Sequence, residues 1–162
     1  MILKFKSLGH KVSHLPLLIV KKINYEKIRF SDYGGIIFTS ANAIKFLDTK
    51  KIDKKILCFC VGSATEQKAK SVGFQNIFVA DGNVSNLKEL IFQNFEPSQG
   101  KIVYVSGKLL SSNLDQELVN HGYQIKRIVN YKTIHNESFD EKFVEQLKLD
   151  IPDITYIYSQ NS

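Results

Sequence analysis

The sequence predicts an α/β protein with a largely parallel sheet, and three observations lead to this prediction. Four segments repeat one pattern, in which an apolar strand ends in a small polar turn that opens a helix. The strands are mostly continuous apolar runs, as expected where helices cover both faces of a sheet. Single glycines, Gly9, Gly73 and Gly122, stand where helices should end just before the next strand. Strands that alternate with helices favour parallel pairing.

Each element has its own signal along the chain. The strand-and-turn segments are residues 35–43, 56–66, 101–110 and 154–162. Apolar residues at helical spacing predict the intervening helices. They are Leu87, Leu90, Ile91 and Phe95, then Leu110, Leu114 and Leu118, and finally Phe139, Phe143, Val144 and Leu147. Two capping boxes, at residues 63–66 and 138–141, predict further helix starts.

The composition limits the class of protein. A chain of 162 residues can bury one good core, or one complete domain plus part of another. No apolar run approaches the roughly 20 residues that cross a bilayer, and the first residues do not resemble a signal peptide, so we expect a cytoplasmic protein without membrane contact. The net charge of +6 favours acidic ligands. All basic residues except Arg29 and Arg127 are scattered lysines, so nucleic-acid binding is not predicted.

Cys58 and Cys60 lie two residues apart in a predicted strand, so their side chains share one face. Neighbouring positions on one face are poorly placed for a disulfide. No cluster of histidine and cysteine accompanies them to complete a zinc site. We expect two buried free thiols and no metal.

Three polar turns follow predicted strands. They consist of Thr39, Ser40 and Ala41, then Gly62, Ser63, Ala64 and Thr65, and finally Ser106, Gly107 and Lys108. In open parallel sheets, ligands bind beyond the carboxyl ends of the strands, where helix starts present free N–H groups. Each turn could hold a carboxylate or a phosphate, or it could simply cap its helix. No GxGxxG motif follows a strand, so a dinucleotide cofactor is not predicted.

Tyr131 lies in the stretch VNYKT, where the chain is expected to pass between structural units. It is either an aromatic side chain packed at a domain junction or a functional group. The residues alone leave both interpretations open.

Taken in order, FTSANA, VGSAT, VNYKT and ITYIYSQNS resemble the uroporphyrinogen-III synthase family over nearly the whole chain. The resemblance implies two flavodoxin-like, three-layer α/β domains joined by a two-stranded linker, one domain being inserted into the other. It places part of the first domain and a linker strand at residues 1–23, and a complete inserted domain at residues 24–129. Residues 130–162 would form the second linker strand and return into an incomplete first domain. We therefore expect a chain truncated at both ends.

The activity that the resemblance implies is that of a lyase in tetrapyrrole, porphyrin and haem biosynthesis. Hydroxymethylbilane would be cyclised to uroporphyrinogen III, with loss of water and inversion of ring D, without cofactor or metal. Thr39, Ser40, Thr65 and Ser159 would line the substrate cleft with the other turn residues. Tyr131 would be the catalytic residue, which hydrogen-bonds the departing oxygen. Family members are typically monomers, and hydroxymethylbilane synthase is a candidate donor of the substrate.

Two other hypotheses remain. The chain could be an inactive remnant of this family that binds carboxylated ligands, or an unrelated receiver or sugar-phosphate-binding module. A receiver needs an acidic cluster at its strand ends, and Asp32, Asp48 and Asp81 form none in the sequence. An incomplete domain would also leave an apolar sheet edge and uncovered faces, which predicts self-association.

Overall fold

The computed structural model of the chain describes residues 2–137 and 141–155. The chain divides into two compact units, one formed by residues 1–19 and 134–162 and the other by residues 20–133. The limits of the second unit lie four residues outside the predicted inserted domain, 24–129, at either end. The predicted two-domain architecture itself stays a prediction.

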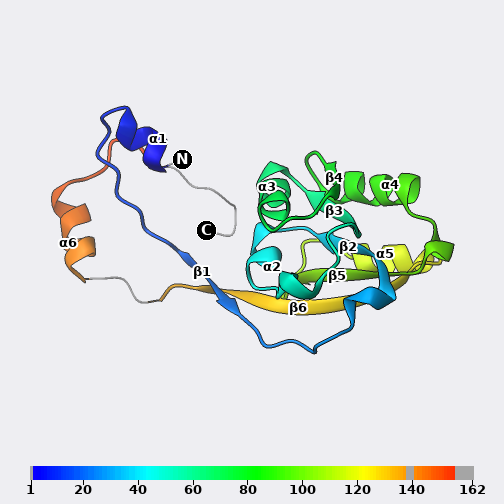
Figure 1. The fold of residues 1–162 in the computed structure, drawn as a ribbon. Coiled ribbons are helices and arrows are strands. Elements are labelled where there is room, and N and C mark those ends of the chain that lie inside the picture. The colour runs from blue at the N-terminus through cyan, green and yellow to red at the C-terminus, as the bar shows by residue number, and fades with distance from the viewer. Residues whose placement is uncertain (1, 138–140, 156–162) are drawn as a thin grey trace. The chain divides into compact units, whose positions relative to one another are not determined.

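The larger unit is built on a largely parallel sheet (Figure 1). The strands among the described residues are β1 Leu18–Lys22, β2 Tyr33–Phe38, β3 Leu57–Val61, β4 Asn76–Ala80, β5 Lys101–Gly107 and β6 Gln124–His135. Their order is β1-β6-β5-β2-β3-β4, and the pairs β2–β3, β3–β4, β2–β5 and β5–β6 are all parallel. The predicted α/β class and largely parallel sheet are confirmed. Counted from β2, the strand order is 3-2-1-4-5, whereas flavodoxin itself has 2-1-3-4-5.

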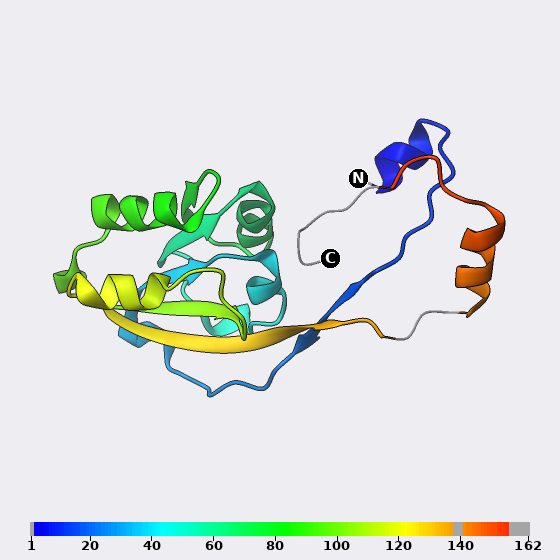
Figure 2. The ribbon, with the colours of Figure 1, turned by 180° about the vertical axis from the view of Figure 1, so that it is seen from behind.

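Helices cover both faces of this sheet. The α-helices are α1 Ile2–Ser7, α2 Ala41–Lys45, α3 Ser63–Ser71, α4 Val84–Asn94, α5 Leu114–Asn120 and α6 Glu141–Leu149. Single 3-10 turns occupy Phe30–Asp32, Thr49–Lys51 and Pro97–Gln99. Figures 1 and 2 show α2 and α3 on one face of the sheet and α4 and α5 on the other. The result is the predicted three-layer arrangement.

Two hydrophobic clusters fill the spaces between the layers. Ile36 and Phe38 of β2 pack in the cluster beneath α2 and α3, whereas Ile37 packs in the cluster beneath α4 and α5. Strand alternation therefore divides a continuous apolar run between two cores. Leu87 and Ile91 are fully buried on α4, so the predicted helical period marks the face that packs on the sheet.

Cys58 and Cys60 are buried free thiols on the α2–α3 face of β3, as predicted. Their Sγ atoms lie 3.7 Å apart. The hydrogen bond to Cys60, together with burial, raises the pKa of the Cys58 thiol far above its ordinary value.

We expect both thiols to be inert in the folded protein, because thiol reagents attack the thiolate and these sulfurs are shielded from solvent. Ellman's reagent should find no reactive thiol in the native chain. In denaturant it should find the two that the sequence contains. Rapid modification of the native protein would contradict the burial of this pair.

The helix ends agree in part with the sequence prediction. Gly73 and Gly122 have positive φ angles of 98° and 86°, and β4 and β6 begin within three residues of them. Gly9 also has a positive φ and ends α1, but the next strand, β1, begins only at Leu18. Helix α5 begins at Leu114, so the prediction that Leu110 belongs to this helix is wrong. Phe139, most of the capping box at 138–141 and most of the strand predicted at 154–162 lie outside the described residues.

The smaller unit contains the short helices α1 and α6. Neither helix has a buried residue among those described. Asn136 ties two chain segments together, since its backbone N–H donates to the Leu17 carbonyl over 2.8 Å and its Nδ2 to the Pro16 carbonyl over 3.0 Å. Within the described part of the chain, no helix has both the length and the apolar character that crossing a membrane requires.

Candidate active site

The three predicted polar turns lie in a row at one edge of the sheet. Phe38 at the end of β2 pairs with Val105 of β5 on one side and Cys60 of β3 on the other. The chain leaves β2 for β3 in one direction, whereas β5 lies in the other, so the strand order reverses at β2. Open α/β sheets bind their ligands at such a reversal, beyond the carboxyl ends of the strands. This edge is therefore the candidate active site.

The polar side chains of the turn after β2 form hydrogen bonds within the protein. The Ser40 Oγ accepts the Asn42 N–H over 3.2 Å and caps α2. The Thr39 Oγ1 lies 3.2 Å from the hydroxyl of Tyr104, a buried residue of β5. Burial raises the pKa of Tyr104, so this phenol stays neutral. Capping accounts for Ser40, and Thr39 links β2 to β5.

The turn after β3 departs from its predicted form. Gly62, with φ 76°, is the N-cap of α3, and Ser63 is its first helical residue. The predicted capping box is therefore wrong, and the Glu66 carboxylate instead accepts the Lys70 ammonium one helical turn later. No side chain among the described residues caps this helix start. Its first N–H groups therefore remain available to an acceptor, because intrahelical bonds do not reach them.

Arg127 of β6 binds the turn that follows β5. The Arg127 Nε donates to the Ser106 Oγ over 2.9 Å, and its Nη2 donates to the carbonyls of Gly107 and Lys108 over 2.9 and 3.2 Å. Ser106 is only 1% exposed, and its hydroxyl also donates to the Gly107 carbonyl. The Ser106 hydroxyl is thus buried and hydrogen-bonded within the protein, whereas the Lys108 side chain is exposed.

Tyr131 lies next to this turn. It pairs with Gly107 across β5 and β6, and its backbone carbonyl accepts the Lys108 N–H over 2.9 Å. A Cβ atom at position 107 would lie only 2.8 Å from Cε2 and Cζ of the Tyr131 ring. The ring therefore occupies space that only a glycine leaves open. Tyr131 is half-buried, which leaves part of the side chain in contact with solvent.

The remaining predicted residues are distributed as follows. Ala41 begins α2 and is half-buried, Ser63 and Ala64 are exposed at the start of α3, and Thr65 is buried. Ser159 lies outside the described residues. The described residues contain no cluster of three or more His, Cys, Asp or Glu that could hold a metal ion.

Tyr104, Arg127 and Asn130 are site residues that the sequence pattern does not predict. Each lies in the interior of a strand, where the sequence indicates only an apolar or alternating pattern. Their contacts depend on the packed structure: Tyr104 reaches Thr39 because β5 pairs with β2, Arg127 reaches Ser106 because β6 pairs with β5, and Asn130 reaches Ala43 of α2. The one available signal was that Arg127 is one of only two arginines, and a guanidinium is well suited to binding several carbonyls at once.

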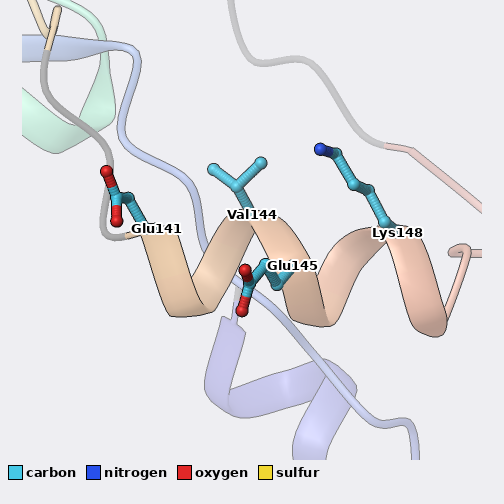
Figure 3. A pocket seen from close by; sticks show the side chains of 4 residues that line it. All are labelled: Glu141, Val144, Glu145 and Lys148. Atoms are coloured by element: carbon cyan, nitrogen blue, oxygen red, sulfur yellow. The ribbon is translucent and has the colours of Figure 1, made fainter.

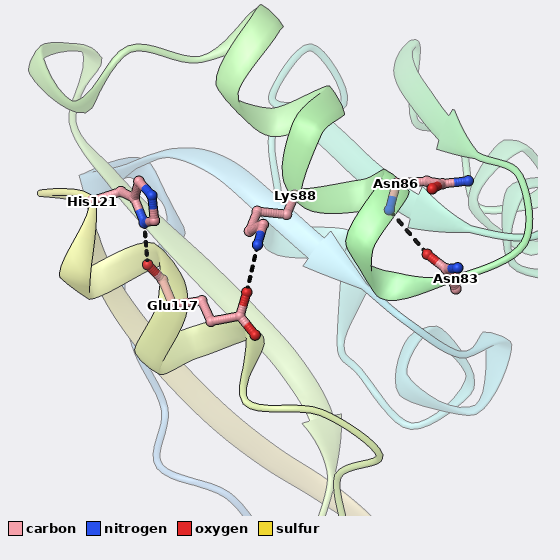
Figure 4. Close-up of polar contacts among 5 residues, drawn as sticks. All are labelled: Asn83, Asn86, Lys88, Glu117 and His121. Carbon is pink, nitrogen blue, oxygen red and sulfur yellow. Dashed lines mark hydrogen bonds and ion pairs between the residues drawn. The ribbon is translucent and has the colours of Figure 1, made fainter.

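Two other features of the surface do not form sites. The hollow in Figure 3 is lined by Glu141, Val144, Glu145 and Lys148, all from α6. Figure 4 shows Lys88 of α4 donating to the Glu117 carboxylate of α5 over 2.7 Å, and Asn83 capping α4. These contacts join and cap the covering helices.

Comparison with known proteins places the chain in a family. The family model for uroporphyrinogen-III synthase HemD matches residues 1–162. The chain belongs to the uroporphyrinogen-III synthase family. The family resemblance inferred from the turns is thereby confirmed, and the family consists of lyases of tetrapyrrole synthesis.

Solved structures of uroporphyrinogen-III synthases have a similar fold. The enzyme from Helicobacter pylori is 21% identical, with a TM-score of 0.61, and the match covers 86% of this chain and 64% of that one. A mutant enzyme from the extremely thermophilic bacterium Thermus thermophilus is 15% identical, with a TM-score of 0.53 and coverages of 90% and 62%. The chain thus spans less than two thirds of either structure. No curated protein matches it in sequence.

Proposed function

We propose that this chain acts as a uroporphyrinogen-III synthase. It would cyclise hydroxymethylbilane to uroporphyrinogen III, with loss of water and inversion of ring D, as a lyase in haem biosynthesis. The observation that carries the proposal is the family match over residues 1–162. The row of polar turns at the strand-order reversal supports it, because ligands of open α/β sheets bind there.

Substrate binding would rest on the helix starts. The substrate carries carboxylates, and the uncapped N–H groups at the start of α3 are suitable donors for such anions. Ser63 and Ala64 are exposed there, and Lys108 is exposed on the turn after β5. Thr39, Ser40, Thr65 and Ser159 complete the proposed lining. Ser106 and Gly107 contribute mainly by shaping the turn, since Arg127 binds both.

Catalysis would consist of folding the substrate and assisting one bond cleavage. Tyr131 hydrogen-bonds the hydroxyl oxygen as the carbon–oxygen bond breaks. The hydroxyl group and the N–H proton of the pyrrole that carried it leave together as water, which yields an azafulvene. The azafulvene carbon then bonds to the substituted carbon of ring D, and the resulting spiro intermediate rearranges with inversion of that ring. Holding the two ends of the substrate together at this hindered carbon selects the inverted product.

The proposal extends to the cellular compartment of the chain, the donor of its substrate and its self-association. We assign the chain to the cytoplasm, with direct transfer of the substrate from hydroxymethylbilane synthase. We also propose that it self-associates. In support, eight of the ten large apolar side chains that are exposed among the described residues belong to the smaller unit.

The test is a coupled assay with freshly generated hydroxymethylbilane, followed by oxidation and separation of the type I and type III isomers. We expect type III in excess over a reaction without the chain, which closes spontaneously to type I. Heat-denatured chain is the control. If only type I formed in the presence of folded chain, the proposed activity would be rejected, and binding of uroporphyrinogen III would then test the inactive-remnant hypothesis.

A further inference from the structure

Asn130 interrupts the pairing of β6 with β5. Ser106 pairs with Val129 and Gly107 pairs with Tyr131, so Asn130 is an additional residue without a partner in β5. Such a β-bulge re-aims the side chains that follow it. Regular alternation would place Tyr131 and Ile128 on opposite faces of the sheet, because they are three residues apart. Both instead pack against the cluster beneath α2 and α3, so the bulge determines which face Tyr131 occupies.

Asn130 also binds α2. Its Nδ2 donates to the Ala43 carbonyl over 2.7 Å. In a longer helix the Ala43 carbonyl would accept the Leu47 N–H. Because α2 is short, the Leu47 N–H donates to the Ile44 carbonyl instead, and the Ala43 carbonyl needs another donor. The backbone carbonyl of Asn130 accepts the Ile23 N–H over 2.8 Å. Asn130 thus joins the bulge, the chain after β1 and the helix that follows the first polar turn.

The side chain of Asn130 is only partly satisfied. It is 0% exposed, and its Oδ1 is the buried side-chain oxygen for which no partner is found among the described residues. A buried oxygen without a partner destabilises a fold, whereas an apolar side chain of similar size would avoid that cost. The Asn130 amide is therefore better explained by how it positions the neighbouring backbone than by a contribution to the stability of the fold.

We infer that Asn130 is a positioning residue that holds Tyr131 in place relative to α2 and the turn of residues 39–41. It acts through the bulge before Tyr131 and through its bond to the Ala43 carbonyl. The inference rests on the proposed function, in which Tyr131 is the catalytic residue. Asn130 itself is too deeply buried to touch a substrate.

The first experiment observes Tyr131 without any substrate. The full chain is labelled with 3-fluorotyrosine, and the fluorine resonance of Tyr131 is assigned as the one that the Tyr131→Phe variant lacks. Asn130→Ala removes the amide, and Asn130→Leu removes it while retaining its approximate shape. We expect both variants to shift or broaden the Tyr131 resonance. Ile36→Val, a buried change in the same cluster, should leave it in place.

The second experiment measures type III product per folded chain. We expect kcat to fall about tenfold in both Asn130 variants with KM nearly unchanged, which is less than the roughly 100-fold that a misplacement of 1 Å can cost. Ile36→Val should keep the kcat of the original chain. A purely structural role would reduce the folded fraction of Asn130→Ala but leave kcat per folded chain unchanged.

The two readouts separate this inference from the proposed function. An unchanged Tyr131 resonance in both Asn130 variants would overturn the inference, whatever the activity. A displaced resonance with unchanged kcat would also overturn it, since the position of Tyr131 would then not matter to the reaction. A displaced resonance in a chain that never forms type III would uphold the placement of Tyr131 by Asn130 and reject the proposed function.

Discussion

Replacing Tyr131 with phenylalanine should lower kcat for type III formation about 100-fold, the lower end of what a positioned acid or hydrogen-bond donor contributes. The ring would still fill the space above Gly107, so the fold and substrate binding should be retained. KM should therefore stay within about twofold of its original value if the lost interaction forms only in the transition state. Steady-state kinetics with both isomers quantified is the measurement.

Tyr123→Phe is the matched control. The Tyr123 hydroxyl donates to the Phe95 carbonyl over 2.8 Å. Tyr123 immediately precedes β6, so it lies at the opposite end of the strands from the candidate site. Losing that hydroxyl should cost about 1 kcal/mol of stability and leave kcat unchanged. If Tyr131→Phe retained full turnover, Tyr131 would be removed from the mechanism and its role would be packing alone.

Substituting alanine for Gly107 should have the second-largest effect on activity. The new Cβ would lie 2.8 Å from the Tyr131 ring, closer than van der Waals contact allows, so the ring must move. A ring at the end of a side chain can move at small cost, so we expect little loss of stability. Because displacement by about 1 Å can cost 100-fold in rate, turnover should fall between tenfold and roughly 100-fold.

Gly34→Ala separates this effect from ordinary overpacking. A Cβ at position 34 would lie 2.8 Å from the backbone carbonyl oxygen of Gln99, which cannot turn aside as a side chain can. We expect about 1–3 kcal/mol lower stability, measured by denaturant unfolding, with turnover per folded chain preserved. If Gly107→Ala behaved like Gly34→Ala, the close contact at Gly107 would matter to the fold and not to the site.

Much of the fold could be predicted because local signals and the global structure agree. The continuous apolar run of β2 and the helical period of Leu87 and Ile91 are inherent in the chain, and burial on both faces of a parallel sheet explains both patterns. The glycines at 73 and 122 marked helix ends for a similarly local reason, since each has a positive φ angle that other residues avoid.

The local sequence pattern gave a wrong prediction at the start of α3, where Ser63 can either cap the helix or be its first residue. Residues 63–66 satisfy the capping-box pattern, yet Gly62 takes the N-cap position and Ser63 enters the helix. The positive φ of Gly62 directs the chain sharply from β3 into α3, and this backbone geometry determines where the helix starts. Whether a serine caps a helix or begins it depends on that turn, which the pattern does not describe.

By itself, the sequence determined the α/β class, the three polar turns and the family, because strand runs, glycine positions and the order of short motifs are all properties of a linear chain. Only the tertiary structure decided that the turns adjoin, that Arg127 holds Ser106 and Gly107, and that Asn130 is the bulge before Tyr131. Those relations depend on the order of the strands and the register of β5 with β6. A register shift of one residue would exchange the faces of every side chain in a strand, and no local pattern specifies it until the whole core is packed.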